Sequence, residues 1–231
     1  MGQIRGVLFD KDGTLFDFQQ TWGAWAEGLF RDLAAGDAAR AEALATVAGY
    51  DMAGQRFEPT SPVIAGTPEE IADLLLPYLP GSDRVALIGR MNTLAAAASM
   101  AEAVPLAPLM HRLRGAGLVL GVATNDAEAP ARAHLYAAGV DGLFDYVAGS
   151  DSGHGAKPGA GPLLAFARLM RLPPETVAMV GDSSHDLHAG RAAGMTCVAV
   201  LTGPATRAEL APLADIVLPD IGHLPGWLGL A

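Results

Sequence analysis

Short apolar runs alternate with longer amphipathic segments over most of the chain, and this alternation most limits the possible folds. Four segments between the runs have helical patterns, and glycines 117, 139 and 194 follow three of them as helix C-caps commonly do. Such alternation predicts an α/β fold, a parallel sheet covered by helices on both faces. The expected strands are Ile4–Phe9, Leu118–Ala123, Tyr146–Ala148, Val177–Val180 and Cys197–Leu201, with Ile216–Leu218 as a sixth candidate; the expected helices are Ala107–Ala116, Ala127–Ala138, Pro162–Met170 and Leu187–Ala193.

A long helical block separates the first expected strand from the second. Within it the pattern predicts an irregular loop over Gly54–Gly66. We therefore expect two domains: an α/β core of residues 1–16 and 105–231, and an inserted helical domain of residues 17–104. The expected helices of the insertion are Thr21–Ala34, Ala38–Ala48, Thr67–Leu79 and Arg84–Ala103.

The composition excludes several classes of protein. Hydrophobic residues make up 51% of the 231 positions, enough for a sizeable core, and the net charge of −10 argues against nucleic-acid or anionic-lipid partners. The longest apolar stretch, Leu94–Val104, is too short for a membrane span and contains Glu102. Because Met1–Phe9 lacks a signal peptide's apolar core, we expect a cytoplasmic protein. Cys197 is the single cysteine, so an internal disulfide is excluded. We expect a monomer or a homodimer.

Four polar clusters follow the expected strands in order. They are Asp10-Lys11-Asp12-Gly13-Thr14, Thr124-Asn125-Asp126, Ala156-Lys157-Pro158 and Gly181-Asp182-Ser183-Ser184-His185-Asp186. Each alone has an ordinary explanation as a turn, a helix cap or a solvated loop charge. Because open α/β sheets bind ligands at the carboxyl ends of their strands, the four together indicate one active site.

These motifs resemble those of the haloacid dehalogenase superfamily, in particular its phosphoglycolate-phosphatase-like branch. Asp10 to Thr14 match the Asp-x-Asp-Gly-Thr motif, Thr124 the Ser/Thr motif, Lys157 the lysine motif, and Gly181 to Asp186 the acidic motif. One departure is Ala160, where relatives often carry a second proline. The resemblance covers about residues 1–16 and 105–205, and it implies a Rossmann-like parallel sheet core with an inserted helical cap domain.

The residue types fit the hydrolysis of a phosphomonoester. A carboxylate can attack phosphorus and form an acyl phosphate, a role given to Asp10, and Asp12 would protonate the leaving alcohol and then activate water. Thr124 stands before a helix whose free N–H groups favour an anion, so Thr124 and Asn125 are expected to bind substrate. Lys157 is expected to act in catalysis and in phosphate binding.

The acidic residues also predict a Mg²⁺ site. Mg²⁺ prefers oxygen ligands, and Asp182 and Asp186 lie four residues apart, which places them on one side of a helical turn. By resemblance, Asp10 and the Asp12 backbone carbonyl complete the protein ligands, with Asp186 either a ligand or a partner of one. Since four carboxylates would repel a phosphate dianion, the site requires the metal, Lys157 and a proton on Asp12.

Four alternatives use similar residues. Haloacid dehalogenases and phosphonate-cleaving relatives lack the second aspartate of the first motif, so Asp12 favours phosphoryl transfer. Sugar-phosphate mutases keep both aspartates and stay open as an alternative. A receiver-type phosphoacceptor domain is a further alternative, although it carries its acceptor aspartate on a middle strand and is a shorter chain.

The resemblance favours phosphoglycolate among small phosphorylated metabolites as the substrate. The polar loop Gly54–Pro59 contains Arg56, and a guanidinium suits the carboxylate of phosphoglycolate through paired hydrogen bonds. One hypothesis is therefore that Arg56 selects substrates with a second anion. The simpler interpretation is an exposed arginine that pairs with Glu58 or solvent.

Overall fold

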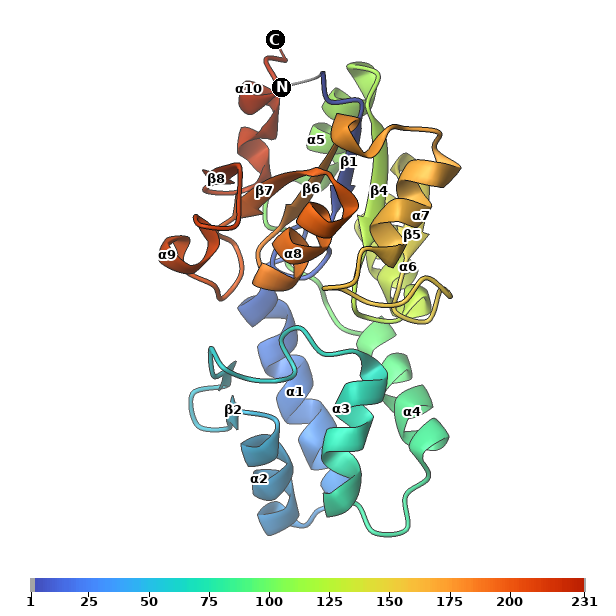
Figure 1. Ribbon diagram of the computed structural model, residues 1–231. Helices are drawn as coiled ribbons and strands as arrows, with labels where there is room; N and C mark the ends of the chain where they lie inside the picture. The colour runs from blue at the N-terminus through green and yellow to red at the C-terminus, as the bar shows by residue number, and fades with distance from the viewer. Residues whose placement is uncertain (1–2, 231) are drawn as a thin grey trace.

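The computed structural model describes residues 3–230 and contains a six-stranded parallel sheet (Figure 1). The strand order is β5-β4-β1-β6-β7-β8, so the first strand of the chain lies inside the sheet. This confirms the α/β fold predicted from the alternation of runs. The strands are β1 (Gly6–Phe9), β4 (Val119–Ala123), β5 (Tyr146–Ala148), β6 (Val177–Gly181), β7 (Thr196–Val200) and β8 (Ile216–Leu218).

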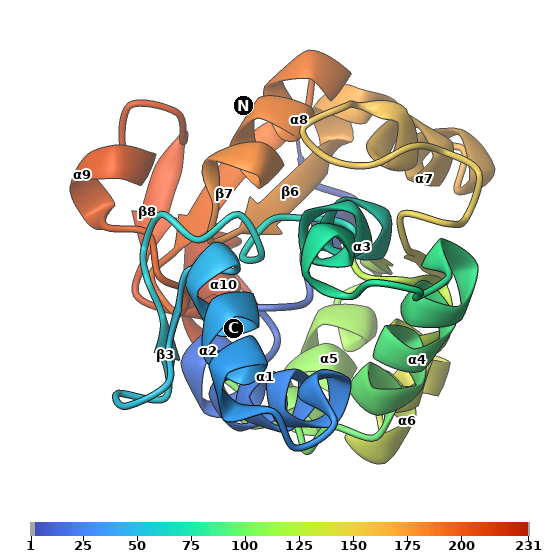
Figure 2. The same ribbon diagram turned by 90° about the horizontal axis from the view of Figure 1, so that it is seen from below.

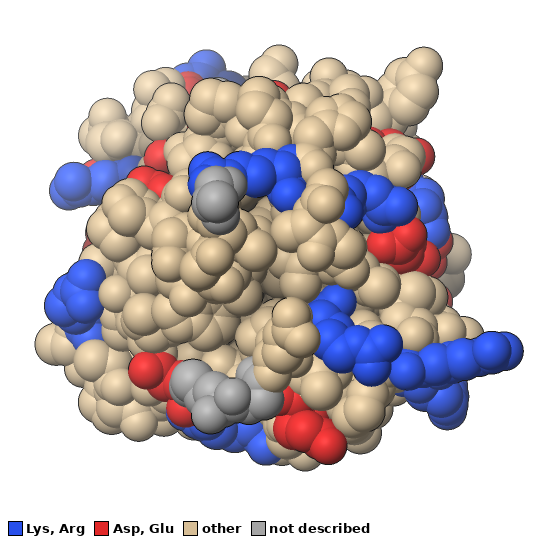
Figure 3. Space-filling model, turned by 90° about the horizontal axis from the view of Figure 1, so that it is seen from above, with Lys and Arg blue, Asp and Glu red and all other residues tan. Residues whose placement is uncertain are grey.

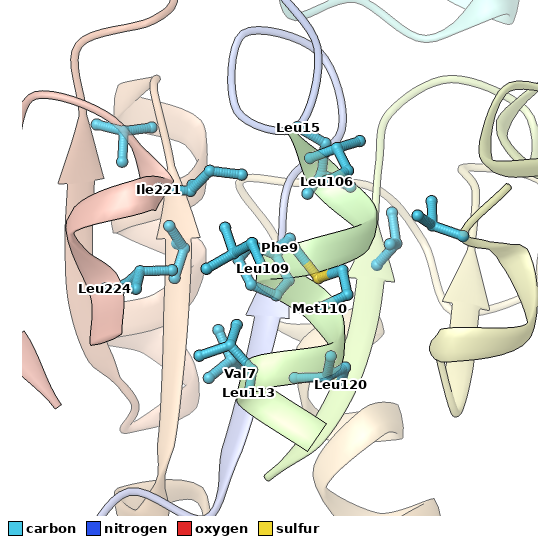
Figure 4. Packing of buried hydrophobic residues seen from close by; sticks show 14 of the residues in the cluster. Val7, Phe9, Leu15, Leu106, Leu109, Met110, Leu113, Leu120, Ile221 and Leu224 are labelled. Carbon is cyan, nitrogen blue, oxygen red and sulfur yellow. The ribbon is translucent and has the colours of Figure 1, made fainter. Parts of the chain in front are cut away.

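Helices cover both faces of this sheet because its strands are apolar on both sides. In β1, Val7 and Phe9 pack with residues of α5 (Leu106–Gly115), α6 (Glu128–Ala137) and α10 (Leu224–Trp227) (Figure 4). The side chain of Leu8 points to the opposite face of the sheet, where it packs with residues of α7 (Gly161–Leu169) and α8 (Ser184–Ala193). A further short helix, α9 (Arg207–Leu210), lies between β7 and β8 in the chain.

Residues 17–104, called the helical part below, lie beyond the carboxyl ends of the strands (Figures 1 and 2). They have their own apolar cluster, which includes Phe30, Leu44, Leu75 and Met91. The elements of the helical part are α1 (Phe18–Ala34), α2 (Ala38–Val47), β2 (Tyr50–Asp51), β3 (Arg56–Phe57), α3 (Pro68–Leu75) and α4 (Arg84–Ala96). Single 3-10 turns occur at Leu76–Tyr78, Asp141–Leu143, Pro174–Thr176 and Ile221–His223.

The helical part differs from the expectations in its last two helices and in its irregular loop. The last helix ends at Ala96 instead of Ala103, because the chain then returns to the core, where the carbonyl of Ala101 accepts a hydrogen bond from the Asp17 N–H. The expected helix Thr67–Leu79 changes to a 3-10 turn after Leu75, since Pro77 lacks the N–H that an α-helix needs. The expected irregular loop contains β3, which pairs with β2.

Within residues 3–230, every helix is too short or too polar to cross a bilayer. Figure 3 shows the face away from the helical part, where Lys and Arg side chains lie in separate groups between wide areas of other residues.

Close packing around Gly121 generates the first prediction. A Cβ at this position in β4 would lie 2.7 Å from a ring carbon of Phe166 and 2.9 Å from Leu8 Cδ1. We expect Gly121→Ala to lower the free energy of unfolding by about 1–3 kcal/mol, because the core must shift to admit a methyl group. Urea denaturation followed by circular dichroism measures this change.

Gly115 provides the matched control. It is the last residue of α5, and a Cβ there would meet no atom within 4 Å. Gly115→Ala should be neutral or slightly stabilising, by up to about 1 kcal/mol. Equal effects of the two substitutions would contradict the packing argument.

Candidate active site

The loop after β1 folds tightly and brings its two aspartates into one pocket. The Asp10 N–H continues the strand pairing by donating to the Val180 carbonyl at 2.8 Å. The chain then turns through Gly13, whose φ of +82° is unfavourable for other residues. A Cβ on Gly13 would also lie 2.3 Å from Asp182 Oδ2, so glycine is required here for both conformation and space.

A buried lysine joins a carboxylate that follows β1 to a carboxylate in the first turn of α8. Lys157 Nζ lies 2.5 Å from Asp10 Oδ1 and 2.6 Å from Asp186 Oδ1, and all three side chains are at least nine-tenths buried. Asp182 lies beside them, and the Thr14 hydroxyl donates to its Oδ1 at 3.3 Å. The structure therefore brings the first, third and fourth sequence motifs together.

Burial changes the protonation equilibria of this cluster. It raises the pKa of Asp10 to about 7, although Lys157 opposes the change. Burial, followed by the charges of Asp10 and Asp186, raises the pKa of Asp182 well above its usual value. For Lys157, burial alone would lower the pKa, but Asp10 and Asp186 together raise it above the ordinary value. With one lysine for three buried carboxylates, full ionisation of the cluster would leave an excess of negative charge.

A divalent cation fits this excess. Carboxylate oxygens of Asp10, Asp182 and Asp186 lie within 4.8 Å of one another. The backbones of Gly13 and Gly203 pack closely against the Asp182 carboxylate, since a Cβ on either residue would collide with it. Hard oxygen donors of this kind suit Mg²⁺, whose positive charge would compensate the buried carboxylates.

The start of α8 fixes Asp186. Ser183 caps this helix in a reciprocal arrangement, in which the Asp186 N–H donates to Ser183 Oγ and the Ser183 N–H donates to Asp186 Oδ2. The second carboxylate oxygen of Asp186 accepts the bond from Lys157. Asp186 is therefore both a member of the acidic cluster and an anchor for the lysine.

Thr124 lies at the end of β4 and lines the same pocket as Asp10 and Lys157. It is buried, and its Oγ1 accepts a hydrogen bond from the Asp126 N–H at 3.1 Å. The hydroxyl proton is free to point toward a ligand in the pocket. The role in phosphate binding expected for Thr124 stays a prediction.

A second buried lysine, which the sequence argument did not use, holds Asp12. Lys11 is fully buried, and its Nζ lies 2.8 Å from Asp12 Oδ1 and 3.2 Å from Asp126 Oδ2. The same Asp12 oxygen accepts a hydrogen bond from Trp22 Nε1 of α1 at 2.8 Å. Burial opposes the charge of Lys11, but Asp12 and Asp126 raise its pKa above the ordinary value.

His134 links this lysine to the helical part. Its Nδ1 lies 3.1 Å from Lys11 Nζ, and its Nε2 lies 2.7 Å from the Ala95 carbonyl of α4. The lysine can only donate and the carbonyl can only accept, so the ring is neutral with its proton on Nε2. Burial and the nearby Lys11 lower the pKa of His134, which agrees with a neutral ring. The spacing of Lys11, Asp126 and His134 in sequence gave no signal of this contact.

The structure gives Asn125 a different task from the expected one. Its Nδ2 donates to the carbonyls of Lys157 and Ala65, at 2.9 and 2.8 Å, and its Oδ1 accepts from the Lys157 N–H. Both amide protons are therefore used within the protein. Asn125 holds the Lys157 loop and ties it to the helical part, instead of offering a donor to substrate.

The structure also places Arg56 away from the expected position. Arg56 lies in β3 with its side chain 71% exposed, and its nearest acidic partner is Asp51 at 4.0 Å. It does not line the pocket that contains Asp10 and Lys157, whereas its neighbour Phe57 does. Side chains alternate along a strand, so Phe57 faces inward and Arg56 faces solvent. The hypothesis that Arg56 selects an anionic substrate is therefore not supported.

The chain belongs to the haloacid dehalogenase-like hydrolases. A family model with that description matches residues 4–194, which include all four polar clusters of the candidate site. The match confirms the family inferred from the sequence motifs.

Among curated proteins, the chain is similar to several phosphoglycolate phosphatases. It is 37% identical to that of Rhodospirillum rubrum over 123 residues, 52% of this chain and 50% of the relative. It is 27% identical to that of Escherichia coli K12 over 241 aligned positions, 98% of this chain and 93% of the relative. The first curated matches cover only about half the length of those relatives.

A solved structure described as a predicted phosphoglycolate phosphatase from Haemophilus somnus 129PT has the same fold. The TM-score is 0.74, with 18% sequence identity, and the alignment covers 98% of this chain and 99% of that one. At this identity the comparison supports the arrangement of sheet and helices.

Removal of the Lys11 ammonium should destabilise the protein. Lys11→Met leaves the carboxylates of Asp12 and Asp126 without their buried cation, so we expect the free energy of unfolding to fall by about 3–5 kcal/mol near neutral pH. The loss should shrink as the pH falls, because Asp126, whose pKa is already raised by burial, then takes up a proton. Urea denaturation at several pH values measures both effects.

The double variant Lys11→Met/Asp126→Asn is the control for the charge argument. Because it also removes one of the two carboxylates, it should recover part of the lost stability. A double variant less stable than Lys11→Met would show that the lysine acts through packing and not through these charges.

Proposed function

We propose that the protein is a Mg²⁺-dependent phosphatase that hydrolyses a small phosphomonoester through an aspartyl-phosphate on Asp10. The observation that carries this proposal is the meeting of Asp10, Asp182 and Asp186 around Lys157, with Asp12 in the same pocket. Nucleophile, acid and metal ligands are thus available to one phosphoryl group.

The buried residues would first bind and orient the substrate dianion. Thr124 donates its hydroxyl to one phosphate oxygen, and Lys157 supplies positive charge beside the Asp10 carboxylate. Asp10, Asp182, Asp186 and the Asp12 carbonyl would hold Mg²⁺, which supplies charge neutralisation when bound. The Asp10 carboxylate then faces phosphorus as a nucleophile.

Two balanced steps follow from these positions. In the first, an Asp10 oxygen forms a bond to phosphorus while the bond from phosphorus to the leaving oxygen breaks, and the carboxylic acid of Asp12 gives its proton to that oxygen. In the second, the Asp12 carboxylate takes a proton from water as the water oxygen bonds to phosphorus. The bond from phosphorus to Asp10 then breaks, which releases inorganic phosphate and restores the free carboxylate.

The helical part, residues 17–104, would act as a cap domain over a core formed by residues 1–16 and 105–231. Its contacts with the site support this role, since Trp22 donates to Asp12 and Ala65 accepts from Asn125. A cap in this position excludes bulk water from the acyl phosphate and orients the acid at the same time.

Phosphoglycolate is the first substrate to test, because similar proteins carry the name phosphoglycolate phosphatase. The sugar-phosphate mutase alternative shares the first step but returns the phosphoryl group to a sugar hydroxyl. Release of inorganic phosphate in proportion to substrate consumed separates hydrolysis from mutase activity. A receiver-type domain would be phosphorylated once and would not turn over.

Replacement of the nucleophile tests the proposal directly. Asp10→Asn keeps the size of the side chain but removes the nucleophile and one metal ligand, so we expect loss of steady-state phosphate release from para-nitrophenyl phosphate. Chelation of Mg²⁺ in the unaltered protein should have the same effect, and added Mg²⁺ should reverse it.

Asp32→Asn is the matched control, because Asp32 lies on the surface of the helical part and pairs with Arg90. This variant should keep its activity. Substantial Mg²⁺-dependent turnover by a folded Asp10→Asn protein would overturn the assignment of Asp10.

The proposed role of Asp12 predicts that the loss of rate in Asp12→Asn depends on the leaving group. For an alkyl phosphate, Asp12→Asn should slow phosphoenzyme formation about 100-fold or more, the usual range for a lost general acid. Para-nitrophenyl phosphate should lose much less, because its leaving group departs without a proton. Rapid-quench measurement of the first step compares the two, and equal losses would argue against a general acid.

A further inference from the structure

The side of the pocket formed by the helical part is almost entirely apolar. We call these residues the apolar wall: Phe18, Trp22, Trp25, Phe57, Val63, Ile64, Ala65, Gly66, Pro68, Ile71, Met91 and Ala95. The helical part also contributes Asn92, which is uncharged, and the Trp25 indole N–H has no hydrogen-bond partner among the described residues. Trp22 and Trp25 pack edge to face, with ring centroids 4.9 Å apart, so the wall presents a rigid aromatic surface.

Among the residues that line the pocket, positive charge is confined to the other side, although the buried Lys11 ammonium lies behind the wall, 5.1 Å from the centroid of the Trp22 ring. Lys157 is the only lysine or arginine among the lining residues, and it already contacts Asp10 and Asp186. The arginines of the helical part lie in ion pairs outside the lining: Arg31 with Glu27, Arg40 with Asp37, Arg56 with Asp51, Arg84 with Asp73 and Arg90 with Asp32. Each of these five side chains is at least 39% exposed.

This distribution decides which leaving group is favourable. The phosphoryl group takes the positive charge at the strand ends, so the leaving group faces the apolar wall. A carboxylate placed there would lose its hydration without gaining a cation, which is unfavourable. An alkyl or aromatic group would instead exchange water for apolar contacts, with a gain of about fourfold in binding for each buried methylene.

We propose that the protein prefers phosphomonoesters of uncharged, apolar alcohols over substrates with a second anionic group such as phosphoglycolate. This inference rests on the proposed phosphatase activity and specifies its substrate class. The apolar wall binds the alkyl or arylalkyl portion, while Lys157 and Thr124 bind the phosphoryl group.

Matched substrate pairs test the preference in the unaltered protein. Butyl phosphate and 3-carboxypropyl phosphate have the same number of carbons and differ in the charge at the end of the chain; ethyl phosphate and phosphoglycolate form a shorter pair. We expect kcat/KM to be at least tenfold higher for the uncharged member of each pair, and to rise from ethyl to butyl phosphate. An equal or higher value for the carboxylated member would overturn the inference.

A charge placed in the wall should reverse the preference. Ile71 lies in α3 and is partly exposed, so a lysine stem can occupy its place while the ammonium reaches the pocket. Ile71→Lys should lower the ratio of kcat/KM for butyl phosphate over 3-carboxypropyl phosphate at least tenfold. Val85→Lys is the control, because Val85 is 75% exposed on α4 and does not line the pocket, and its ratio should stay unchanged. Equal shifts in both variants would overturn the inference.

Inhibition by phosphonates tests binding without bond cleavage and needs no variant. Pentylphosphonate and 4-carboxybutylphosphonate copy the longer substrate pair, with a methylene in place of the ester oxygen. The uncharged compound should inhibit the unaltered protein at least tenfold more strongly, with para-nitrophenyl phosphate as the reporter substrate. Equal or stronger inhibition by the carboxylated compound would overturn the substrate class.

The experiments distinguish failure of the phosphatase proposal from failure of the inferred substrate class. If a correctly folded protein with Mg²⁺ released no phosphate from any of these esters or from para-nitrophenyl phosphate, the phosphatase proposal would fall, and the inference with it. Mg²⁺-dependent turnover with a preference for the carboxylated esters would overturn the substrate class alone.

Discussion

The contact of the Lys157 ammonium with Asp10 and Asp186 is the interaction on which the site depends. Asp10, directly after β1, and Asp186, in the first turn of α8, would repel each other in a buried position, and the lysine allows them to remain close. The loop that carries Lys157 is in turn held by Asn125. Asp182 adds a further buried carboxylate, so full ionisation of the cluster would leave excess negative charge. A divalent cation bound there would balance this charge.

A second buried cation organises the boundary between the core and the helical part. Lys11 connects Asp12 and Asp126 of the core, and through His134 it reaches the Ala95 carbonyl of α4. Trp22 contacts Asp12 from the other side. The carboxyl group proposed as the acid is thus fixed by residues of both parts, so its orientation depends on how the helical part sits over the strands.

The two sides of the pocket carry different types of residue, charged on the core side and apolar on the side of the helical part. In the proposed reaction, the strand ends supply the charged groups for phosphoryl transfer, whereas the helical part supplies aromatic and aliphatic side chains such as Trp25 and Ile71. Such a division lets the same reacting groups serve different esters, because the leaving group contacts residues that take no part in proton transfer. The substrate class we infer therefore follows from the helical part, and the reaction class from the sheet.

The parallel sheet and the order of the four motifs could be predicted from the sequence, because local periodicity and strand-end positions are encoded in neighbouring residues. The same reasoning proposed a candidate site of Asp10, Asp12, Thr124, Lys157, Asp182 and Asp186. It could not reveal that Lys11 and His134 meet, since they lie 123 positions apart. Sequence reasoning also assigned Asn125 and Arg56 to substrate binding. In the structure the Asn125 amide donates to two backbone carbonyls, and Arg56 faces solvent. Those outcomes were decided by tertiary structure, because the partners of a side chain depend on which segments pack together.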